Sequence, residues 1–279
     1  MSHAVPLTTG MEPRPGFRLR QVLGRGGFAE VWEAETSSGD SVALKFMSCN
    51  DSLAAAKEIR ALEGIRKLQH PNLIRIHQVW CIPGYIVIAM ELADGSLLDL
   101  YDAYQEEFRT PILAEQVCLH LMQAAEGIDF MNAHQHMIDG RRVGFQHCDI
   151  KPSNLLLFDD DTVKVADFGL ASPTCSVMRA HLRAGTLDYA APEVFQGRLS
   201  DWTDQYALAI TYCQLRGGRF PFRDTPPNFQ RAYTRPAPDL TMLSERERPI
   251  VARALAPVPQ DRWPTCSDFM SRLSKTVLD

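Results

Sequence analysis

The sequence has no long apolar run, and this absence already narrows the class of protein. No stretch of the 279 residues approaches the roughly 20 consecutive apolar residues of a membrane-spanning helix. The N-terminus also lacks the apolar core of a secretory signal peptide. We therefore expect no membrane segment in this chain and a cytoplasmic location, either as a soluble protein or as the cytosolic domain of a larger membrane protein.

Cysteine and histidine clusters at metal or redox spacing are missing as well. The seven cysteines include no Cys-x-x-Cys, and an odd number cannot form a complete disulfide framework. His134 and His136 are close together but have no matching pair for a zinc site, so we expect structural or surface roles for them. Excess positive charge is also absent: a formal net charge of −5 gives no electrostatic basis for binding nucleic acid.

Hydrophobic patterning predicts a mixed α and β chain. Strands are expected from residue 17 to 23, at 42–45, around 73–80 and at 85–90, and helices over 53–68 and 117–131. Residues 1–16 are rich in proline and glycine and are predicted to form a flexible arm. The stretch 136–144 is predicted to be an exposed loop.

One loop carries most of the chemistry that the sequence offers. Residues 143–154 read Val-Gly-Phe-Gln-His-Cys-Asp-Ile-Lys-Pro-Ser-Asn, followed by an apolar run. Asp149, Lys151 and Asn154 thereby place a carboxylate, an ammonium and a carboxamide at fixed positions on one loop. Such a loop suits phosphoryl transfer, which requires a hydroxyl, a phosphate and a metal ion to be held in line.

A second motif makes a chance arrangement a poor explanation. Asp167-Phe168-Gly169 begins thirteen residues after Asn154. With these two motifs the chain resembles the protein kinase family. The residues of its motifs look most similar to those of bacterial Hanks-type serine/threonine kinases. The resemblance covers about residues 17–275. It implies an α+β, bilobal protein kinase fold, with a small antiparallel β lobe plus one helix over 17–91 and a large, mainly helical lobe over 92–279.

The small lobe is expected to bind the phosphates of ATP. Residues 23–31 (Leu-Gly-Arg-Gly-Gly-Phe-Ala-Glu-Val) predict a hairpin whose backbone N–H groups reach phosphate oxygens, although such glycines alone equally fit a plain tight turn. Ala29 stands where the family usually has a third glycine, which predicts a slightly stiffer lid. Lys45 lies in an apolar strand and needs anionic partners. The resemblance implies that these are ATP and Glu58, rather than Glu58 being a solvated charge.

The adenine ring is expected between apolar side chains. By resemblance, residues 91–95 form the hinge that bonds the adenine edge, and Met90 controls the back of the pocket; without the resemblance the apolar positions would be assigned to the core. The residues expected to bind ATP are Leu23, Gly24, Gly26, Phe28, Ala29, Val31, Ala43, Lys45, Met90, Glu91, Ala93 and Leu156.

Catalytic roles also follow from the resemblance. Asp149 would accept or orient the proton of the substrate hydroxyl, Lys151 would neutralise charge on the γ-phosphate, and Thr186 would hydrogen-bond near both. Asn154 and Asp167 would hold Mg²⁺, with Mn²⁺ as an alternative. The five polar positions that the chemistry requires are all filled: Lys45, Glu58, Asp149, Asn154 and Asp167. We therefore predict a serine/threonine protein kinase that transfers the γ-phosphoryl group of ATP to a protein substrate.

Cys148 departs from the family pattern. In most of the family an arginine at this place pairs with a phosphorylated residue of the activation segment, here 167–193, and a neutral thiol cannot make that pair. We hypothesise that phosphorylation of this segment, which offers Ser172, Thr174 and Ser176, is not the on-switch. A buried or merely tolerated thiol is favoured over a redox role for Cys148 or Cys175.

Buried polar contacts are expected to hold the large lobe. By resemblance, Asp204 should anchor the catalytic loop, and Glu193 should pair with Arg262. A column of side chains is expected to link the lobes, formed by Leu62, Ile76, His147 and Phe168.

Two other classes of function fit parts of the pattern. A nucleotide-binding scaffold would bind ATP without transferring phosphate. A small-molecule phosphotransferase shares the bilobal fold but usually lacks the long segment that ends here in Ala191-Pro192-Glu193. The presence of that segment favours a polypeptide substrate.

Overall fold

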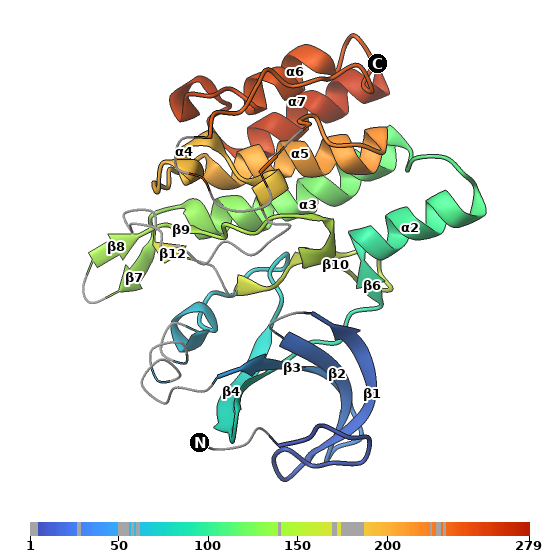
Figure 1. Ribbon diagram of the computed structural model, residues 1–279, viewed down its shortest axis with the longest axis vertical. Coiled ribbons are helices and arrows are strands. Elements are labelled where there is room, and N and C mark those ends of the chain that lie inside the picture. Colours follow the sequence, from blue (N-terminus) through green and yellow to red (C-terminus); the bar gives the residue numbers. More distant parts are fainter. Residues whose placement is uncertain are drawn as a thin grey trace. The chain divides into compact units, whose positions relative to one another are not determined.

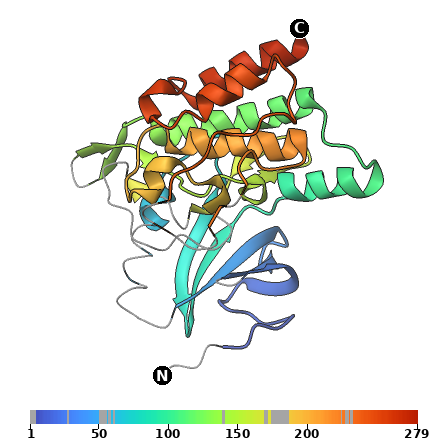
Figure 2. The ribbon, with the colours of Figure 1, turned by 45° about the horizontal axis from the view of Figure 1, so that its top comes forward.

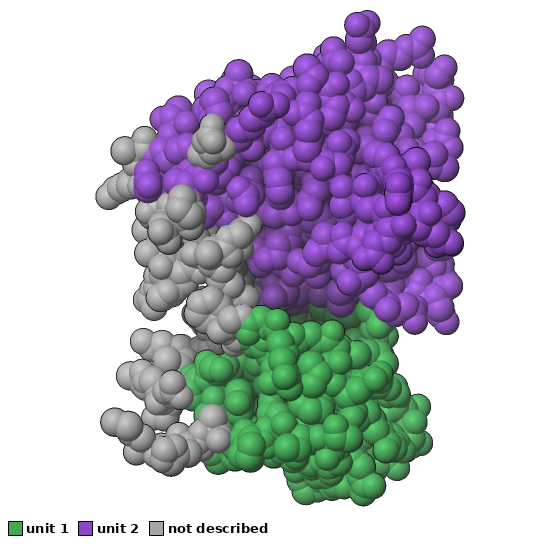
Figure 3. All heavy atoms as spheres, turned by 45° about the vertical axis from the view of Figure 1, so that its right-hand side comes forward, with its two compact units in different colours: residues 1–69, 74–93 green, residues 70–73, 94–279 purple. Residues whose placement is uncertain are grey.

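The computed structural model describes residues 5–26, 29–49, 56, 59, 62–138, 141–168, 172–173, 187–223, 225–226, 230 and 233–279. The chain divides into two compact units (Figure 3), unit 1 with residues 1–69 and 74–93 and unit 2 with residues 70–73 and 94–279. Among the described helices, none is both long and apolar enough to cross a lipid bilayer.

Unit 1 is built on a five-stranded antiparallel sheet (Figure 1). Its strands, in spatial order, are β1 (Phe17–Arg25), β2 (Ala29–Thr36), β3 (Ser41–Ser48), β5 (Tyr85–Met90) and β4 (Ile76–Ile82). The predicted strands are confirmed, with β4 beginning at Ile76 rather than at residue 73. Residues 56, 59 and 62–65 are helical, within the predicted helix 53–68, and Leu62 and Ile65 are buried.

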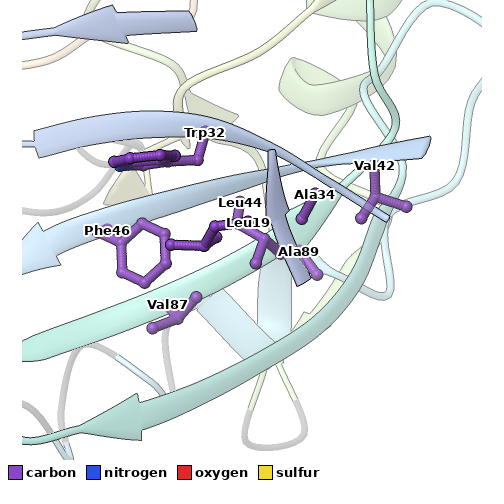
Figure 4. Close-up of a cluster of buried hydrophobic side chains, with 8 residues drawn as sticks. All are labelled: Leu19, Trp32, Ala34, Val42, Leu44, Phe46, Val87 and Ala89. Carbon is purple, nitrogen blue, oxygen red and sulfur yellow. The ribbon is translucent and has the colours of Figure 1, made fainter. Parts of the chain in front are cut away.

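Side-chain alternation gives the sheet one closely packed face. The buried cluster in Figure 4 takes every second residue of the strands. Its members are Leu19, Trp32, Ala34, Val42, Leu44, Phe46, Val87 and Ala89. The intervening positions of β2 and β3, among them Val31 and Lys45, therefore belong to the opposite face. The sequence period alone thus separates the residues of the core from the residues predicted to meet a nucleotide.

The N-terminal segment differs from the predicted flexible arm. Leu7 and Met11 pack against the core cluster of unit 1, and the backbone N–H of Gly10 donates to Leu19 O at 2.8 Å. Arg14 lies over the ring of Trp80, with its guanidinium carbon 5.4 Å from the ring centroid. Apolar packing, backbone hydrogen bonds and the Arg14 contact together attach residues 5–16 to the sheet.

Unit 2 is mainly helical (Figure 2). Its helices are α2 (Leu97–Glu107), α3 (Ala114–Asn132), α4 (Pro192–Phe195), α5 (Thr203–Gly217), α6 (Arg248–Ala254) and α7 (Cys266–Leu278). α3, green in the figure, packs against α5 (orange) and α7 (red). The residues at helical spacing that predict a buried α3 are all buried, which confirms that prediction: Val117, Leu121, Ala124, Ile128 and Met131. The Asp129 carboxylate accepts the N–H groups of Cys266 and Ser267, both at 2.8 Å, and so fixes the start of α7 against α3.

Short paired strands flank the loops of unit 2. β6 (Gly95–Ser96), β10 (Leu155–Leu157) and β11 (Val163–Val165) form one small sheet, and β9 (Phe145–Gln146) pairs with β12 (Ser172–Pro173). The connections described in unit 2 include the 3₁₀ turns η1 (Pro152–Asn154), η3 (Leu187–Tyr189) and η4 (Pro259–Asp261).

The stretch 136–144 was predicted to be an exposed loop, but the structure has two short strands here. β7 (His136–Ile138) pairs with β8 (Arg141–Val143) as an antiparallel hairpin. His136 fixes its base, because Nε2 donates to Phe130 O at 2.8 Å and the ring stacks edge-on against Phe130. Three-residue strands are too short to give a recognisable alternation in the sequence, which is why the prediction was wrong.

Gly127 allows α3 to lie close to the chain at 70–73. A Cβ atom at this position would lie 2.6 Å from Asn72 O, a distance that real Cβ atoms do not reach. We expect Gly127→Ala to lower the free energy of unfolding by about 1–3 kcal/mol, because the helix must move away from the backbone at Asn72. Urea unfolding followed by far-UV circular dichroism measures this loss. The control is Gly64→Ala, where nothing lies within 4 Å and a small gain is expected. Equal effects of the two substitutions would contradict the packing argument.

Candidate active site

The loop between β9 and β10 is anchored by a buried carboxylate of α5. Asp204 is 1% exposed. Its oxygens accept the backbone N–H groups of His147 at 2.7 Å and of Cys148 at 2.9 Å. Burial raises the pKa of Asp204, and the two N–H donors only partly oppose this effect. The anchoring role predicted for Asp204 is confirmed.

His147 connects the two sequence motifs through both nitrogens of its ring. Nε2 lies 2.9 Å from Ala166 O and must donate, since a carbonyl oxygen only accepts. Nδ1 accepts the N–H of Asp149 at 3.3 Å. These partners assign the neutral tautomer with the proton on Nε2. The ring also contacts Phe168 edge-to-face, with centroids 5.4 Å apart, which forms the unit 2 half of the predicted column. Its continuation through the unit 1 residues Leu62 and Ile76, both buried, stays a prediction.

The three predicted polar residues of the loop form one hydrogen-bonded group. The carboxylate of Asp149, a residue only 2% exposed, lies 3.0 Å from Lys151 Nζ through each of its oxygens. Asn154 Nδ2 donates to the same carboxylate at 3.0 Å and to the Asp149 backbone carbonyl at 2.8 Å. The loop thus presents a carboxylate whose orientation is fixed from two sides.

The β10–β11 ladder brings the two candidate metal ligands to the same end of a hairpin. Asn154 immediately precedes β10 and Asp167 follows shortly after β11, and these strands are antiparallel. The N–H of Ala166 donates to Asn154 O at 2.9 Å and closes that end. Asp167 has a left-handed backbone with φ of 65°, which for a residue with a Cβ atom is costly and is concentrated at functional sites.

In unit 1, the residues predicted to contact ATP share the face of the sheet opposite its core cluster. Val31 pairs with Lys45 across β2 and β3, and Ala43 pairs with Met90 across β3 and β5. Lys45 is buried despite its charge, at 7% exposure. Glu58, its predicted partner, lies outside the described residues, as do Phe28 and Thr186.

The remaining predicted nucleotide residues lie at a turn, at a strand end and in a small sheet. Leu23 and Gly24 belong to β1, and the N–H of Gly26 donates to Ala29 O at 2.8 Å across the start of the glycine-rich turn. The N–H of Glu91 donates to Arg75 O at 3.2 Å just after β5, and Ala93 follows in the same unit. Leu156, in unit 2, pairs with Ser96 and Lys164.

The chain matches the family model of the protein kinase domain over residues 17–276. It belongs to the protein kinase family. It is 32% identical to CBL-interacting protein kinase 4 of Oryza sativa subsp. japonica, over 90% of this chain and 56% of that protein. It is 29% identical to the serine/threonine-protein kinases PknE and PknF of Mycobacterium tuberculosis, over 91% and 92% of this chain and 44% and 56% of those proteins. The chain therefore spans about half the length of these relatives.

These comparisons confirm the family and the α+β kinase fold predicted from the sequence. An antiparallel sheet dominates unit 1 and helices dominate unit 2, as that fold requires. Protein kinases generally use ATP and Mg²⁺ and act on protein substrates.

Cys148 contributes a neutral side chain to the loop between β9 and β10 of this kinase domain. Its backbone is left-handed, with φ of 65°, and Sγ donates to Gln146 O at 3.5 Å. Burial raises the pKa of the thiol well above its ordinary value, and the carboxylates of Asp204 and Asp149 add to this effect. The thiol is therefore protonated at neutral pH, which argues against the redox role. Thr174, Cys175 and Ser176 lie outside the described residues.

The predicted ion pair between Glu193 and Arg262 is confirmed. Arg262 makes two parallel contacts, Nη1 to Oε1 at 2.9 Å and Nη2 to Oε2 at 2.8 Å, and its side chain is completely buried. Ser200 and Thr203 each donate a hydroxyl to Glu193 Oε1 at 3.0 Å. Burial opposes ionisation of Glu193, but Arg262 and these donors outweigh it and hold the pKa of the carboxyl below its ordinary value.

One buried cation of the kinase domain was missed in the sequence. Arg235 is 8% exposed and donates to the backbone of η3 and of Ala190. It lies in a segment without helix or strand, so no periodicity marks it as buried. The stretch between α5 and α6 holds five arginines, and its sequence has no motif that distinguishes Arg235 from Arg219, Arg223, Arg231 and Arg246.

The Glu193–Arg262 pair gives this domain a defined pH dependence. Because the pKa of Glu193 is lower in the folded state, the pair stabilises the domain fully above the ordinary value of 4.5 and loses its contribution as pH falls through the folded pKa. We expect Glu193→Gln to cost about 3–5 kcal/mol near neutral pH and less below about pH 4. Urea unfolding across this pH range measures both effects. Glu245→Gln, at an exposed carboxylate of the same unit, serves as control. A cost that stays constant with pH would contradict the assignment.

Proposed function

We propose that this chain is a serine/threonine protein kinase that transfers the γ-phosphoryl group of ATP to Ser or Thr hydroxyls of a protein substrate. The observation that carries the proposal is the arrangement of Asp149, Lys151 and Asn154, three polar groups bonded to one another on a loop anchored by Asp204. The named serine/threonine kinases among the relatives favour the same acceptor chemistry.

Asp149 is the residue that receives or orients the proton of the acceptor hydroxyl. Its carboxylate is nearly buried and held by Lys151 and Asn154, so it has a fixed direction in which to accept a hydrogen bond. Lys151 also brings a positive charge to the place where charge develops on the transferred phosphoryl group. Its position two residues after Asp149 is the serine/threonine kinase pattern. Thr186 is proposed to hydrogen-bond near this pair.

The residues proposed for Mg²⁺ fit a hard cation. Asn154 Nδ2 is identified by its two acceptors on Asp149, which leaves Oδ1 as the amide atom to meet a metal ion. Asp167, at the same end of the β10–β11 hairpin, adds a carboxylate. An amide oxygen and a carboxylate are ligands that Mg²⁺ prefers, and Mn²⁺ accepts the same set. The ion would neutralise phosphate charge during transfer.

The nucleotide is proposed to lie on the face of the unit 1 sheet that carries Val31, Ala43 and Lys45. Lys45 would bind the α- and β-phosphates, and the N–H groups of the turn at Gly24 and Gly26 would cover them. Glu58 would orient Lys45. The adenine contacts are proposed for the other residues predicted from the sequence: Leu23, Phe28, Ala29, Met90, Glu91, Ala93 and Leu156.

Removing either proposed charge should abolish transfer. We expect Asp149→Asn and Lys45→Met each to lower phosphorylation of dephosphorylated casein by about 10²–10⁴-fold in the presence of ATP and Mg²⁺. Asp159→Asn and Lys67→Met, at exposed positions, are matched controls and should retain activity. Mass spectrometry identifies the modified residues. Wild-type protein that binds ATP but transfers no phosphate would contradict the proposal and favour the scaffold.

Phosphorylation of the activation segment should not be required. With the neutral Cys148 in place of an arginine, the loop offers no cation at that position for a phosphate. We expect the triple substitution of Ser172, Thr174 and Ser176 by Ala to keep casein phosphorylation within about threefold of wild type. Loss of activity in a variant with an unchanged melting temperature would show the hypothesis to be wrong.

A further inference from the structure

Arg235 binds the backbone of a turn, residues 187–190, near the end of the activation segment. Its Nη2 donates to Leu187 O at 2.6 Å and to Asp188 O at 2.8 Å. Its Nε and Nη2 donate to Ala190 O at 3.0 and 2.9 Å. One planar guanidinium thus donates to three closely spaced carbonyls. The five fixed donors of arginine suit this arrangement, whereas the ammonium group of lysine does not.

The guanidinium is itself held rigidly. It lies over the ring of Phe222, 4.6 Å from the centroid, and at 5.6 Å from the ring centroid of Phe195 on α4. Nη1 donates to Thr225 Oγ1 at 3.1 Å. A buried cation needs such partners, because each N–H left without an acceptor costs desolvation free energy. Arg235 therefore holds the turn in one conformation.

This turn forms a wall beside the proposed catalytic carboxylate. A small cavity of about 10 Å³ is lined by Cys148, Asp149 and Ile150 on one side and by Tyr189, Ala190 and Ala191 among the residues on the other. Tyr189 attaches the turn to two neighbouring elements. Its OH donates a hydrogen bond to Gln214 of α5, and its ring makes an edge-on contact with Phe220, which follows α5. The position of the turn relative to Asp149 thus depends on groups behind it, with Arg235 making most of the backbone contacts.

We infer that Arg235 is a positioning residue for the polypeptide acceptor, which it serves by fixing the turn 187–190 beside Asp149. This inference rests on the proposed kinase function. Arg235 holds the turn through hydrogen bonds to backbone carbonyls, which require no phosphorylated residue. The neighbouring Cys148 has no positive charge that could bind a phosphate. The substrate-facing turn is therefore preformed, and its order does not depend on a modified residue.

The test separates acceptor binding from nucleotide chemistry. Arg235→Met removes the carbonyl contacts, and Arg235→Lys keeps the charge but not the planar fork. Arg223→Met is the matched control, because the Arg223 side chain is 77% exposed and pairs with Asp239, at 3.3 Å, on the surface of the same segment. The readouts are KM and kcat for dephosphorylated casein, KM for ATP, ATP hydrolysis without acceptor, and amide hydrogen exchange of residues 187–191.

We expect Arg235→Met to raise KM for casein about 10- to 100-fold and to accelerate exchange at 187–191, with KM for ATP and ATP hydrolysis within about twofold of wild type. Arg235→Lys should give a smaller change in the same direction, and Arg223→Met none. An unchanged KM for casein, or an equal loss of ATP hydrolysis and casein phosphorylation, would overturn the inference. Loss of hydrogen-exchange protection in α5 in both Arg235 variants would also overturn the inference, because Arg235 would then stabilise the core of unit 2 rather than position the turn. A wild-type protein that transfers no phosphate would instead refute the proposed function, and the inference with it.

Discussion

The hydrogen bonds from His147 and Cys148 to the Asp204 carboxylate are the constraint on which the rest of the site depends. α5 is buried along almost its whole length, so Asp204 has a fixed position in the core. A carboxylate there is costly unless it is hydrogen-bonded, and the loop backbone supplies the donors. The loop in turn gains a support strong enough to keep Cys148 in a left-handed conformation that a non-glycine residue rarely adopts. Asp149, the next residue, takes its direction from this strained position.

From this anchor the site is assembled largely through backbone groups. The ring of His147 donates a hydrogen bond to Ala166 O, and the N–H of Ala166 donates to Asn154 O. The two motifs that share the chemistry are therefore fixed to each other before any side chain meets a ligand. Preorganisation of this kind lowers the cost of reaching the productive geometry. It also explains why a neutral, protonated thiol is acceptable at position 148: the backbone N–H of that residue holds the loop to Asp204, and the thiol needs no charge for its hydrogen bond to Gln146 O.

How much could be predicted from the sequence depends on how local each signal is. The period of two in β2 and β3 separates Trp32 and Leu44 from Val31 and Lys45. The motifs predict Asp149, Asn154 and Asp167 as site residues. The Glu193–Arg262 pair could be predicted only through the family resemblance, because 69 residues separate its members. Short or irregular segments gave wrong or missing predictions. The hairpin 136–143 has strands of three residues. The segment 5–16 attaches through two apolar side chains, backbone hydrogen bonds and Arg14, and Arg235 lies where no described helix or strand imposes a period.

Two buried arginines hold the stretch from Leu187 to Glu193, one at each end. Arg235 binds the carbonyls at its start and Arg262 binds the carboxylate at its end, and both come from the C-terminal part of unit 2. Burying two cations is a poor way to gain stability, since desolvation offsets much of the attraction. It is an effective way to select one conformation, because an unpaired buried guanidinium or carboxylate penalises every alternative arrangement. The segment that we propose to face the polypeptide acceptor is therefore ordered by charges built into the fold, and not by a charge on the neutral side chain of Cys148.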